Sequence, residues 1–211
     1  MDHVYWGPGY TDKEIQFVLD KTGVKYKKVS SIEKETALKL TEGNIIGWFQ
    51  GRVEWGPRAL GGRSLLADPR RSDMKNILNE RIKRREPFRP FAPSVLKEEA
   101  SNWFIIPKKC NSISTEFMEI NFDVKENKRK KIPAVTHADG TSRVQLVNKK
   151  TNPSYYRLID QFYKITKVPM LLNTSFNDNE PIVCSPEDAV KTFLRTKMDY
   201  LAIGNYLVSK R

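Results

Sequence analysis

Two short segments rich in arginine, glycine and proline contain most of the residues that could do chemistry. The first covers residues 51–64 (GRVEWGPRALGGRS), and the second covers residues 83–94 (KRREPFRPFAPS). Glycine and proline are typical of fixed turns, and a guanidinium matches the geometry of phosphate and carboxylate groups. Arginines held in such turns can converge on one anion. The composition therefore predicts an oxyanion or phosphate site.

The glycines and prolines suggest how each segment would surround an anion. The arginines that alternate with glycines in the first segment are Arg52, Arg58 and Arg63. Glycine allows backbone N–H groups to approach a ligand closely, and the prolines on both sides of Phe88 and Arg89 hold that backbone extended. Clustered cations need nearby carboxylates to stay ordered when no ligand is bound, so we expect Glu54 and Glu86 to hold the arginines in place.

Taken together, these segments resemble the C-terminal domain of the O-carbamoyltransferases that modify nodulation factors and antibiotics. The resemblance covers nearly the whole chain, in the order that is typical of the family. The matching stretches are residues 51–64, 68–70 (DPR), 85–93 (REPFRPFAP), 141–145 (TSRVQ), 172–177 (LNTSFN), 180–183 (EPIV) and 199–204 (DYLAIG). A composite match of this length is far more specific than a single glycine motif.

The resemblance implies a YrdC-like α/β fold, which is a twisted mixed sheet with flanking helices and a positively charged concave face. It also implies that this domain consumes carbamoyl phosphate and ATP and forms carbamoyl-adenylate. A separate N-terminal domain, which resembles sugar kinases and contains a metal, would then pass the carbamoyl group to a hydroxyl of an acceptor. Mg²⁺ bound mainly by the ATP phosphates would suit the reaction.

The candidate site residues lie in the segments that match the family. Carbamoyl phosphate is a small dianion, and fixed cations are needed to neutralise its phosphoryl oxygens while phosphate leaves. The catalytic candidates are Arg58, Lys83, Arg89 and Arg143. The substrate-binding candidates are Asn173, Ser175, Arg52 and Arg63.

The substrate-binding candidates fall into two kinds. Asn173 and Ser175 follow an apolar, β-branched stretch, so we expect them at the carboxyl end of a strand, where ligands of open α/β sheets usually bind. Arg52 and Arg63 are expected either to orient the first segment or to contact the nucleotide. No residue stands out as a covalent nucleophile.

Length and composition limit the class of protein. A chain of 211 residues with 39% hydrophobic residues can form one domain with a real core, and we expect a single domain over residues 1–211. The formal charge of +12 favours acidic ligands such as phosphorylated metabolites, ATP or nucleic acid. No apolar run is long enough to cross a bilayer and no leader follows Met1, so we expect a soluble, cytoplasmic protein without a membrane partner.

The residues that bind metals or form disulfides are few. Two histidines, His3 and His137, make no convincing metal cluster, and no metal site is predicted. The two cysteines lie far apart in sequence, which favours a reduced protein, and the apolar neighbours of Cys184 predict a buried, unreactive thiol.

Two other functions fit the same sequence. A basic YrdC-like domain could bind nucleic acid such as tRNA, although the aromatic residues are not interleaved with basic residues as in a stacking platform. The chain could also be a non-catalytic domain that completes a site at an interface. The basic run at residues 125–131 is interpreted as an exposed, mobile loop.

Strands and helices are predicted in alternation, which is typical of an α/β domain. The predicted strands are residues 3–6, 24–29, 44–49, 63–67, 143–148, 168–172 and 200–208. The predicted helices are residues 11–23, 30–43, 72–82, 152–163 and a last helix that begins at Ser185 and Pro186. Residues 105–131 are predicted to be mostly an irregular connection.

Overall fold

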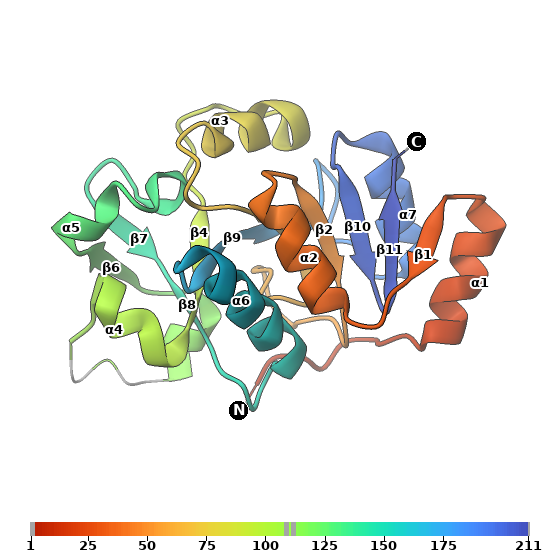
Figure 1. The fold of residues 1–211 in the computed structure, drawn as a ribbon, viewed down its shortest axis with the longest axis horizontal. Coiled ribbons are helices and arrows are strands. Elements are labelled where there is room, and N and C mark those ends of the chain that lie inside the picture. Colours follow the sequence, from red (N-terminus) through yellow and green to blue (C-terminus); the bar gives the residue numbers. More distant parts are fainter. Residues whose placement is uncertain (1–2, 108–109, 111–112, 211) are drawn as a thin grey trace.

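A large mixed sheet forms the centre of the molecule (Figure 1), in a computed structural model that describes residues 3–107, 110 and 113–210. Its strands are β1 (Tyr26–Lys28), β2 (Ile46–Phe49), β3 (Arg63–Ala67), β4 (Ala92–Leu96), β8 (Gln145–Val147), β9 (Met170–Ser175), β10 (Tyr200–Ile203) and β11 (Tyr206–Ser209). They lie in the order β1-β11-β10-β2-β3-β9-β4-β8. Only β10 with β2 and β4 with β8 pair in parallel among these strands. The predicted α/β class with a mixed sheet is confirmed.

A smaller antiparallel sheet adjoins the main one. It consists of β5 (Phe104–Ile105), β6 (Asn121–Val124) and β7 (Thr141–Arg143). Only Val144 separates β7 from β8, so the chain passes directly from the small sheet to the large one. Arg143 therefore lies at the junction of the two sheets.

Helices cover the main sheet on both sides. They are α1 (Asp12–Thr22), α2 (Ile32–Thr41), α3 (Met74–Leu78), α4 (Ala100–Trp103), α5 (Glu126–Arg129), α6 (Pro153–Thr166) and α7 (Pro186–Arg195), with a π-helical turn η1 (Asn79–Lys83) and 3₁₀ turns η2 (Lys97–Glu99), η4 (Ile113–Phe117) and η5 (Pro133–Val135). Helices α2 and α6 lie side by side in front of the sheet, and α7 lies behind β10 (Figure 1).

Side-chain caps explain why the predicted helices begin where they do. Thr11 and Glu14 form a reciprocal capping box at the start of α1, and Gly23 ends that helix with a φ of 65°. Ser185 and Asp188 form the same arrangement at α7. The helices expected from these signals are confirmed.

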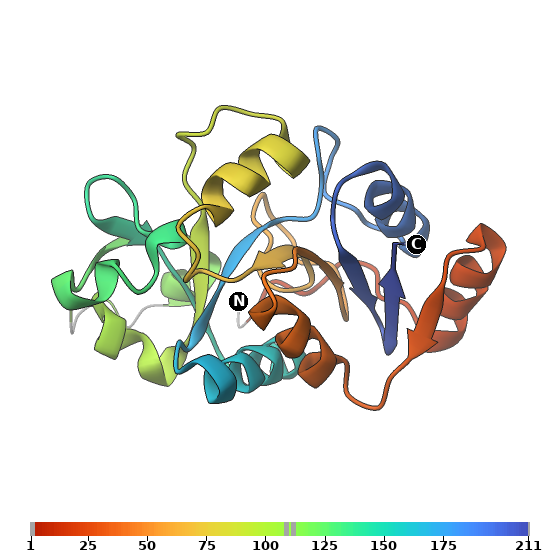
Figure 2. The ribbon, with the colours of Figure 1, turned by 45° about the horizontal axis from the view of Figure 1, so that its top comes forward.

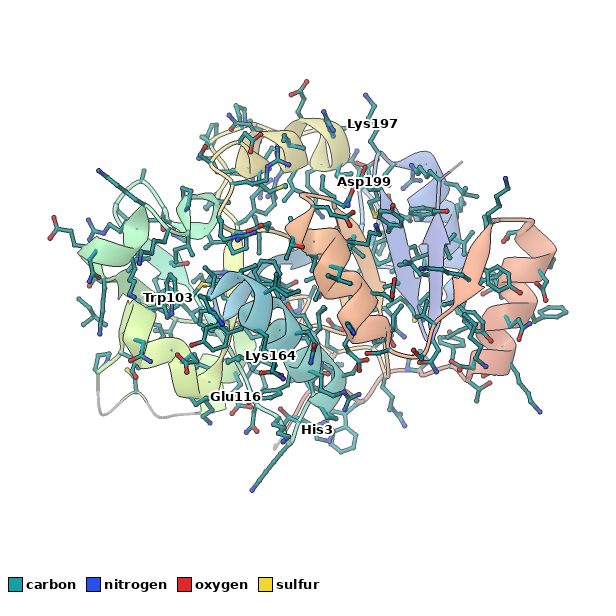
Figure 3. The ribbon with its side chains drawn as sticks, in the orientation of Figure 1. His3, Trp103, Glu116, Lys164, Lys197 and Asp199 are labelled. Carbon is teal, nitrogen blue, oxygen red and sulfur yellow. The ribbon has the colours of Figure 1, made fainter. Side chains whose placement is uncertain are left out.

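The core lies between the sheet and its helices. All residues of β2, β3 and β4 are buried, as are the first four of β9. Asp199, labelled in Figure 3, accepts a hydrogen bond of 2.7 Å from the backbone N–H of Ile45 and so fixes the start of β2. Among the described residues, no helix is both long and apolar enough to span a bilayer. The cytoplasmic location stays a prediction.

Several predicted elements were wrong. Residues 3–6 form no strand, because their backbone bonds irregularly to the first arginine segment, with Trp55 N–H donating to Val4 O at 2.7 Å. Residues 200–208 form a hairpin, β10 and β11, that turns at Gly204 with a φ of 53°. Strand β4 was not predicted, because its short apolar run contains Pro93.

The stretch from residue 105 to 131 is more regular than predicted. It contains β6, α5 and a 3₁₀ turn, while residues 108–109 and 111–112 lie outside the described residues. Part of the basic run is helical. Lys128 Nζ lies 4.7 Å from the ring centroid of Trp103 (labelled in Figure 3), and Arg129 Nε donates to Val124 O at 3.1 Å. Most of the run is exposed, as predicted, but the assignment of the whole run to a loop was wrong because residues 126–129 form α5.

Candidate functional site

A cavity of about 230 Å³ lies where β9 ends and β4 begins. Its described lining includes four arginines and no acidic residue. The polar and charged lining residues are Arg58, Arg85, Arg89, Arg143, Asn173, Thr174 and Ser175. Pro57, Ala59, Pro90, Phe91, Ala92 and Met118 complete the wall. The volume is several times that of a water molecule, so a small phosphorylated molecule would fit.

A buried carboxylate holds the backbone that follows Arg58 in the first arginine segment. Glu54 is 5% exposed, and its Oε1 accepts the backbone N–H groups of Leu60, Gly62 and Arg63 at 2.6, 3.2 and 3.2 Å. A Cβ added at Gly62 would collide with Glu54 Oε2, which explains the glycine. Two glycine N–H groups that could have met a ligand are thus used by the protein itself, Gly62 by Glu54 and Gly61 by Ser64 Oγ at 3.0 Å. The prediction that Glu54 would hold the arginines in place was wrong about the contacts, because Glu54 bonds to backbone N–H groups and not to guanidinium groups.

Arg63 does not line the cavity. Its side chain is fully buried, with Cζ 3.5 Å from the ring centroid of Phe49, and its guanidinium donates to four carbonyl oxygens. The acceptors are the carbonyl oxygens of Pro8, Gln50, Gly51 and Gly62, at 3.0–3.4 Å. Burial lowers the pKa of Arg63 to about 10. Of the two roles that the sequence left open for Arg63, the geometry fits the orienting one.

Arg52 also lies outside the cavity lining. Its guanidinium donates to Gly7 O at 2.9 Å and to Trp6 O at 2.8 Å, so it ties the start of the chain to the first segment. Arg52 is exposed. These contacts likewise fit an orienting role and not a contact with a ligand in the cavity.

Lys83 lies at the end of the π-helical turn that continues α3. It is 5% exposed, and its Nζ is within hydrogen-bonding distance of four oxygens contributed by Ser175 and Asn177, at 2.7–3.2 Å. The turn ends at Arg84, which has a φ of 44°. Burial and the neighbouring charge of Arg85 lower the pKa of Lys83 to about 7. Lys83 is therefore adjacent to the cavity through Ser175 and is not part of its lining.

Asn79 shapes the second arginine segment and was not predicted from the sequence. Its side chain is buried, and its Nδ2 donates to Pro87 O at 3.2 Å and Arg89 O at 3.1 Å, while its Oδ1 accepts from Arg85 Nε at 2.7 Å. Figure 2 shows the segment as an arch beside the loop that follows β9. An asparagine inside the apolar stripe of Leu78 and Ile82 was the available signal, because buried amides usually have a specific partner.

The cavity arginines repel one another. Burial lowers the pKa of Arg143, and the charge of Arg58 lowers it further. Burial and the charge of Arg89 do the same to the pKa of Arg85. Within the part of the chain that the structure describes, Arg58 Nε and Arg143 Nε are buried without a hydrogen-bond partner. An anion in the cavity would relieve this excess of charge.

The predicted candidates are partly brought together. Arg58, Arg89, Arg143, Asn173 and Ser175 line one cavity. Arg85 joins them although it was not selected from the sequence, where it stood in the same segment as Lys83 and Arg89. The Ser175 hydroxyl donates to Asn177 Oδ1 at 2.7 Å. Glu86 is exposed.

The position of Asn173 and Ser175 has a different cause from the one expected. Both residues belong to β9 itself, which pairs antiparallel with β3 and with β4. The rule for ligands at the carboxyl ends of parallel strands therefore does not explain their place. They reach the cavity because β9 continues for three residues beyond Leu172, and Asn173 pairs with Ala92, the first residue of β4.

The histidine and cysteines take no part in this cavity. His137 lies in a turn, where its Nδ1 is 3.3 Å from Thr141 Oγ1, and burial lowers its pKa. Cys110 and Cys184 are not disulfide-bonded. Cys184 is exposed at the start of α7, so the prediction of a buried thiol was wrong. The described residues contain no group of three or more histidine, cysteine or acidic side chains that could hold a metal ion.

Known proteins resemble this chain over its full length. It is 46% identical to the nodulation protein NolNO of Sinorhizobium fredii, over 100% of this chain and 31% of that protein. It is 45% identical to the nodulation protein NolO of Bradyrhizobium diazoefficiens, over 99% of this chain and 38% of that protein. The chain thus spans about a third of the length of these relatives.

Solved structures establish the fold type. P. abyssi Sua5, solved with L-threonine, superposes with a TM-score of 0.60 at 15% identity, over 82% of this chain and 46% of Sua5. Full-length HypF, solved with phosphate and nucleotide, gives a TM-score of 0.55 at 19% identity, over 89% of this chain and 22% of HypF. The expected YrdC-like fold is confirmed. Residues 37–210 match the family described as carbamoyltransferase C-terminus, and the chain belongs to that family.

Proposed function

We propose that this chain binds carbamoyl phosphate and ATP in the arginine-lined cavity and forms carbamoyl-adenylate. The observation that carries the proposal is the set of four cavity arginines, two of which have buried Nε groups without a partner in the described chain. Charge-assisted hydrogen bonds from arginine to phosphoryl oxygens are among the strongest in proteins. Family membership supplies the carbamoyl chemistry, and the cavity supplies a place for a small dianion.

The proposed reaction has two steps. Water and carbamoyl phosphate give carbamate and inorganic phosphate, as the bond between the carbamoyl and phosphoryl groups breaks. An oxygen of carbamate then attacks the α-phosphorus of ATP, and pyrophosphate leaves with the electron pair of the broken P–O bond. Both steps develop negative charge on phosphoryl oxygens, which Arg58, Arg89 and Arg143 would neutralise. Mg²⁺ would enter with ATP, held mainly by its phosphates.

Neighbouring residues would prepare the cavity for this reaction. Lys83 anchors the end of β9 through Ser175, while Asn79 fixes the backbone on both sides of Arg89. Fixed donors stabilise developing charge without reorganising during the reaction. We assign Lys83 to electrostatic support of the bound phosphate, and Asn173 and Ser175 to contacts with the carbamoyl or phosphoryl group.

Transfer to an acceptor would need a partner. The nodulation relatives are about three times as long as this chain, and we propose that a domain from the remainder of such proteins accepts carbamoyl-adenylate and holds the acceptor hydroxyl. Incubating the chain alone with carbamoyl phosphate, ATP, Mg²⁺ and a panel of hydroxyl compounds should give no carbamoylated product by mass spectrometry. Robust transfer by the chain alone would contradict this division of labour.

The test of the adenylation step is pyrophosphate release. With carbamoyl phosphate, ATP and Mg²⁺, the chain should release both phosphate and pyrophosphate, and Arg58→Ala should abolish both signals. Arg81→Ala is the matched control, because Arg81 is exposed on the π-helical turn and does not line the cavity. Equal ATP turnover without carbamoyl phosphate would exclude the proposal. The nucleic-acid alternative predicts instead a gel shift whose affinity falls steeply with salt.

A further inference from the structure

Asn173 lines a cavity whose charged groups only donate hydrogen bonds, and its own side chain holds an unused acceptor. Its side chain is 1% exposed and lines the cavity. Its Nδ2 lies 2.9 Å from Ala59 O, 2.9 Å from Ser94 Oγ and 3.2 Å from Gln145 Oε1. Its Oδ1 has no partner among the described residues. A buried acceptor left unpaired is costly, so its presence calls for a donor supplied from outside the chain.

The direction of the surrounding hydrogen bonds fixes which end of the amide is the acceptor. Gln145 Nε2 donates to Leu60 O at 2.9 Å, and a carbonyl oxygen can only accept. Gln145 Oε1 is therefore an acceptor, and it receives the Ser94 hydroxyl at 2.5 Å. Ser94 Oγ, having used its proton, accepts from Asn173 Nδ2.

A second carbonyl gives the same answer independently. Ala59 O also faces Asn173 Nδ2, so a flipped amide would place two oxygens against each other. The two N–H groups of Nδ2 serve these three acceptors, and reversing Asn173 would take both donors away from them. The amide is thus held in one orientation by Ala59, Ser94 and Gln145, with Oδ1 as its free end.

A fixed acceptor among arginines suits a small molecule that carries both an anionic and an N–H-bearing end. Arginine side chains have donors and no acceptor, so they serve the phosphoryl oxygens and cannot bind an amino group. Asn173 Oδ1 can accept from an –NH₂ group. A methyl group in the same place would leave Oδ1 buried and unpaired, and sites built to bind an N–H reject analogues without it.

We propose that Asn173, locked by Ser94 and Gln145, makes the cavity select an acyl phosphate with an amino group over one with a methyl group. This inference rests on the proposed function and adds its basis of specificity. Asn173 is the specificity determinant, and Ser94 and Gln145 are positioning residues that act through it.

The test compares carbamoyl phosphate with acetyl phosphate, in which a methyl group replaces the amino group, and with inorganic phosphate. Titration calorimetry on the 211-residue chain should give an affinity for carbamoyl phosphate about 10- to 100-fold higher than for acetyl phosphate, the value of one hydrogen bond whose acceptor is otherwise left buried and unpaired. In Asn173→Ala this ratio should fall to about 1, since only the carbamoyl contact is lost.

Two further variants separate selection from general damage. Gln145→Met removes one acceptor of the Asn173 amide and frees the Ser94 proton, so the ratio should fall partway. Thr174→Ser alters a neighbouring lining residue and should keep the ratio. The wild-type comparison needs no substitution, so the test stands even if a buried variant fails to fold.

The possible outcomes distinguish the two proposals. If the wild-type chain binds neither acyl phosphate more tightly than inorganic phosphate, the proposed function and this inference both fall. If it binds carbamoyl and acetyl phosphate equally, the inference is overturned while the phosphate site stands. If Asn173→Ala weakens the binding of carbamoyl phosphate and of acetyl phosphate by the same factor, Asn173 has only a structural role and the inference is also overturned.

Discussion

Arg63 and Arg143 come from two matching segments of the sequence, yet their side chains serve opposite purposes. Arg63 is fully buried, stacks on Phe49 and donates to four carbonyl oxygens of its own chain. Arg143 is half-buried in the cavity wall, faces the charge of Arg58 and has a buried Nε without a described partner. The Arg63 guanidinium bonds to the fold through both terminal nitrogens, and only its Nε lacks a partner among the described residues. Arg143 lines the cavity beside a second cation, so an external anion would stabilise it. Replacing Arg63 should therefore mainly lower the stability of the fold, whereas replacing Arg143 should mainly weaken ligand binding.

The largest effect should follow from Arg63→Ala. The substitution leaves four carbonyl oxygens without their donor and opens a space over Phe49, so the free energy of unfolding should fall by about 3–4 kcal/mol. Denaturant unfolding measures this. Arg52→Ala is the control, since Arg52 is exposed and its loss should cost about 1 kcal/mol or less. Equal losses in the two variants would contradict the assignment of Arg63 to the core.

The next effect tests the carboxylate that supports Arg58. Glu54→Leu leaves the N–H groups of Leu60, Gly62 and Arg63 unpaired, so the free energy of unfolding should fall by about 2–3 kcal/mol. Binding of carbamoyl phosphate should weaken as well, because the backbone around Arg58 loses its anchor. Glu86→Gln, at an exposed position, should change stability by less than about 0.5 kcal/mol. A stable Glu54→Leu variant would show that the loop holds its shape without the carboxylate.

The pH dependence of binding tests Lys83. In the free chain Lys83 has a pKa of about 7, and a bound dianion would raise it, so binding should take up a proton above that pH. The affinity for carbamoyl phosphate should therefore fall about tenfold between roughly pH 7 and 8.5, where the phosphoryl group is already dianionic. Calorimetry in buffers of different ionisation enthalpy would reveal the proton uptake. Lys83→Met should bind more weakly with a flat profile, and a wild-type profile equally flat would exclude this role.

The smallest expected effect is the change in stability caused by Arg143→Met, which should contrast with the large loss in Arg63→Ala. Because Arg143 repels Arg58, Arg143→Met should leave the free energy of unfolding unchanged or raise it by about 0.5 kcal/mol, the scale of partly exposed charge interactions. Any gain should shrink as salt is added, since salt screens the repulsion. Thermal unfolding at low and high salt measures it. A clear loss of stability would mean that Arg143 has a structural partner after all.

Local signals in the sequence predicted much of the fold. The capping residues Thr11 and Ser185 marked helix starts because their side chains bond to nearby backbone, and that interaction depends on few residues. Strand β4 and the extension of β9 could not be predicted in this way. Their hydrogen bonds run to strands distant in sequence, and β9 pairs with residues more than 70 positions away.

The sequence identified most of the residues that line the cavity, but it did not predict the contacts that each of them makes. Arg58, Arg89, Arg143, Asn173 and Ser175 do line one cavity, while their roles in binding stay predictions. The sequence could not separate Arg63 from Arg58, because both stand among glycines and only the folded chain decides which one meets carbonyl oxygens. Asn79 was missed for a similar reason, since its place in an apolar stripe predicts a buried amide but not the partners that the folded chain gives it.

The most direct test of the account is the affinity of the chain for carbamoyl phosphate, measured by calorimetry in the wild type, Arg89→Ala and Arg143→Met. Each substitution removes a charge-assisted contact to the phosphoryl group, so each should weaken binding about 10- to 100-fold without lowering stability. Arg81→Ala should bind like the wild type. Unchanged affinity in both cavity variants would contradict the claim that the four cavity arginines form the anion site.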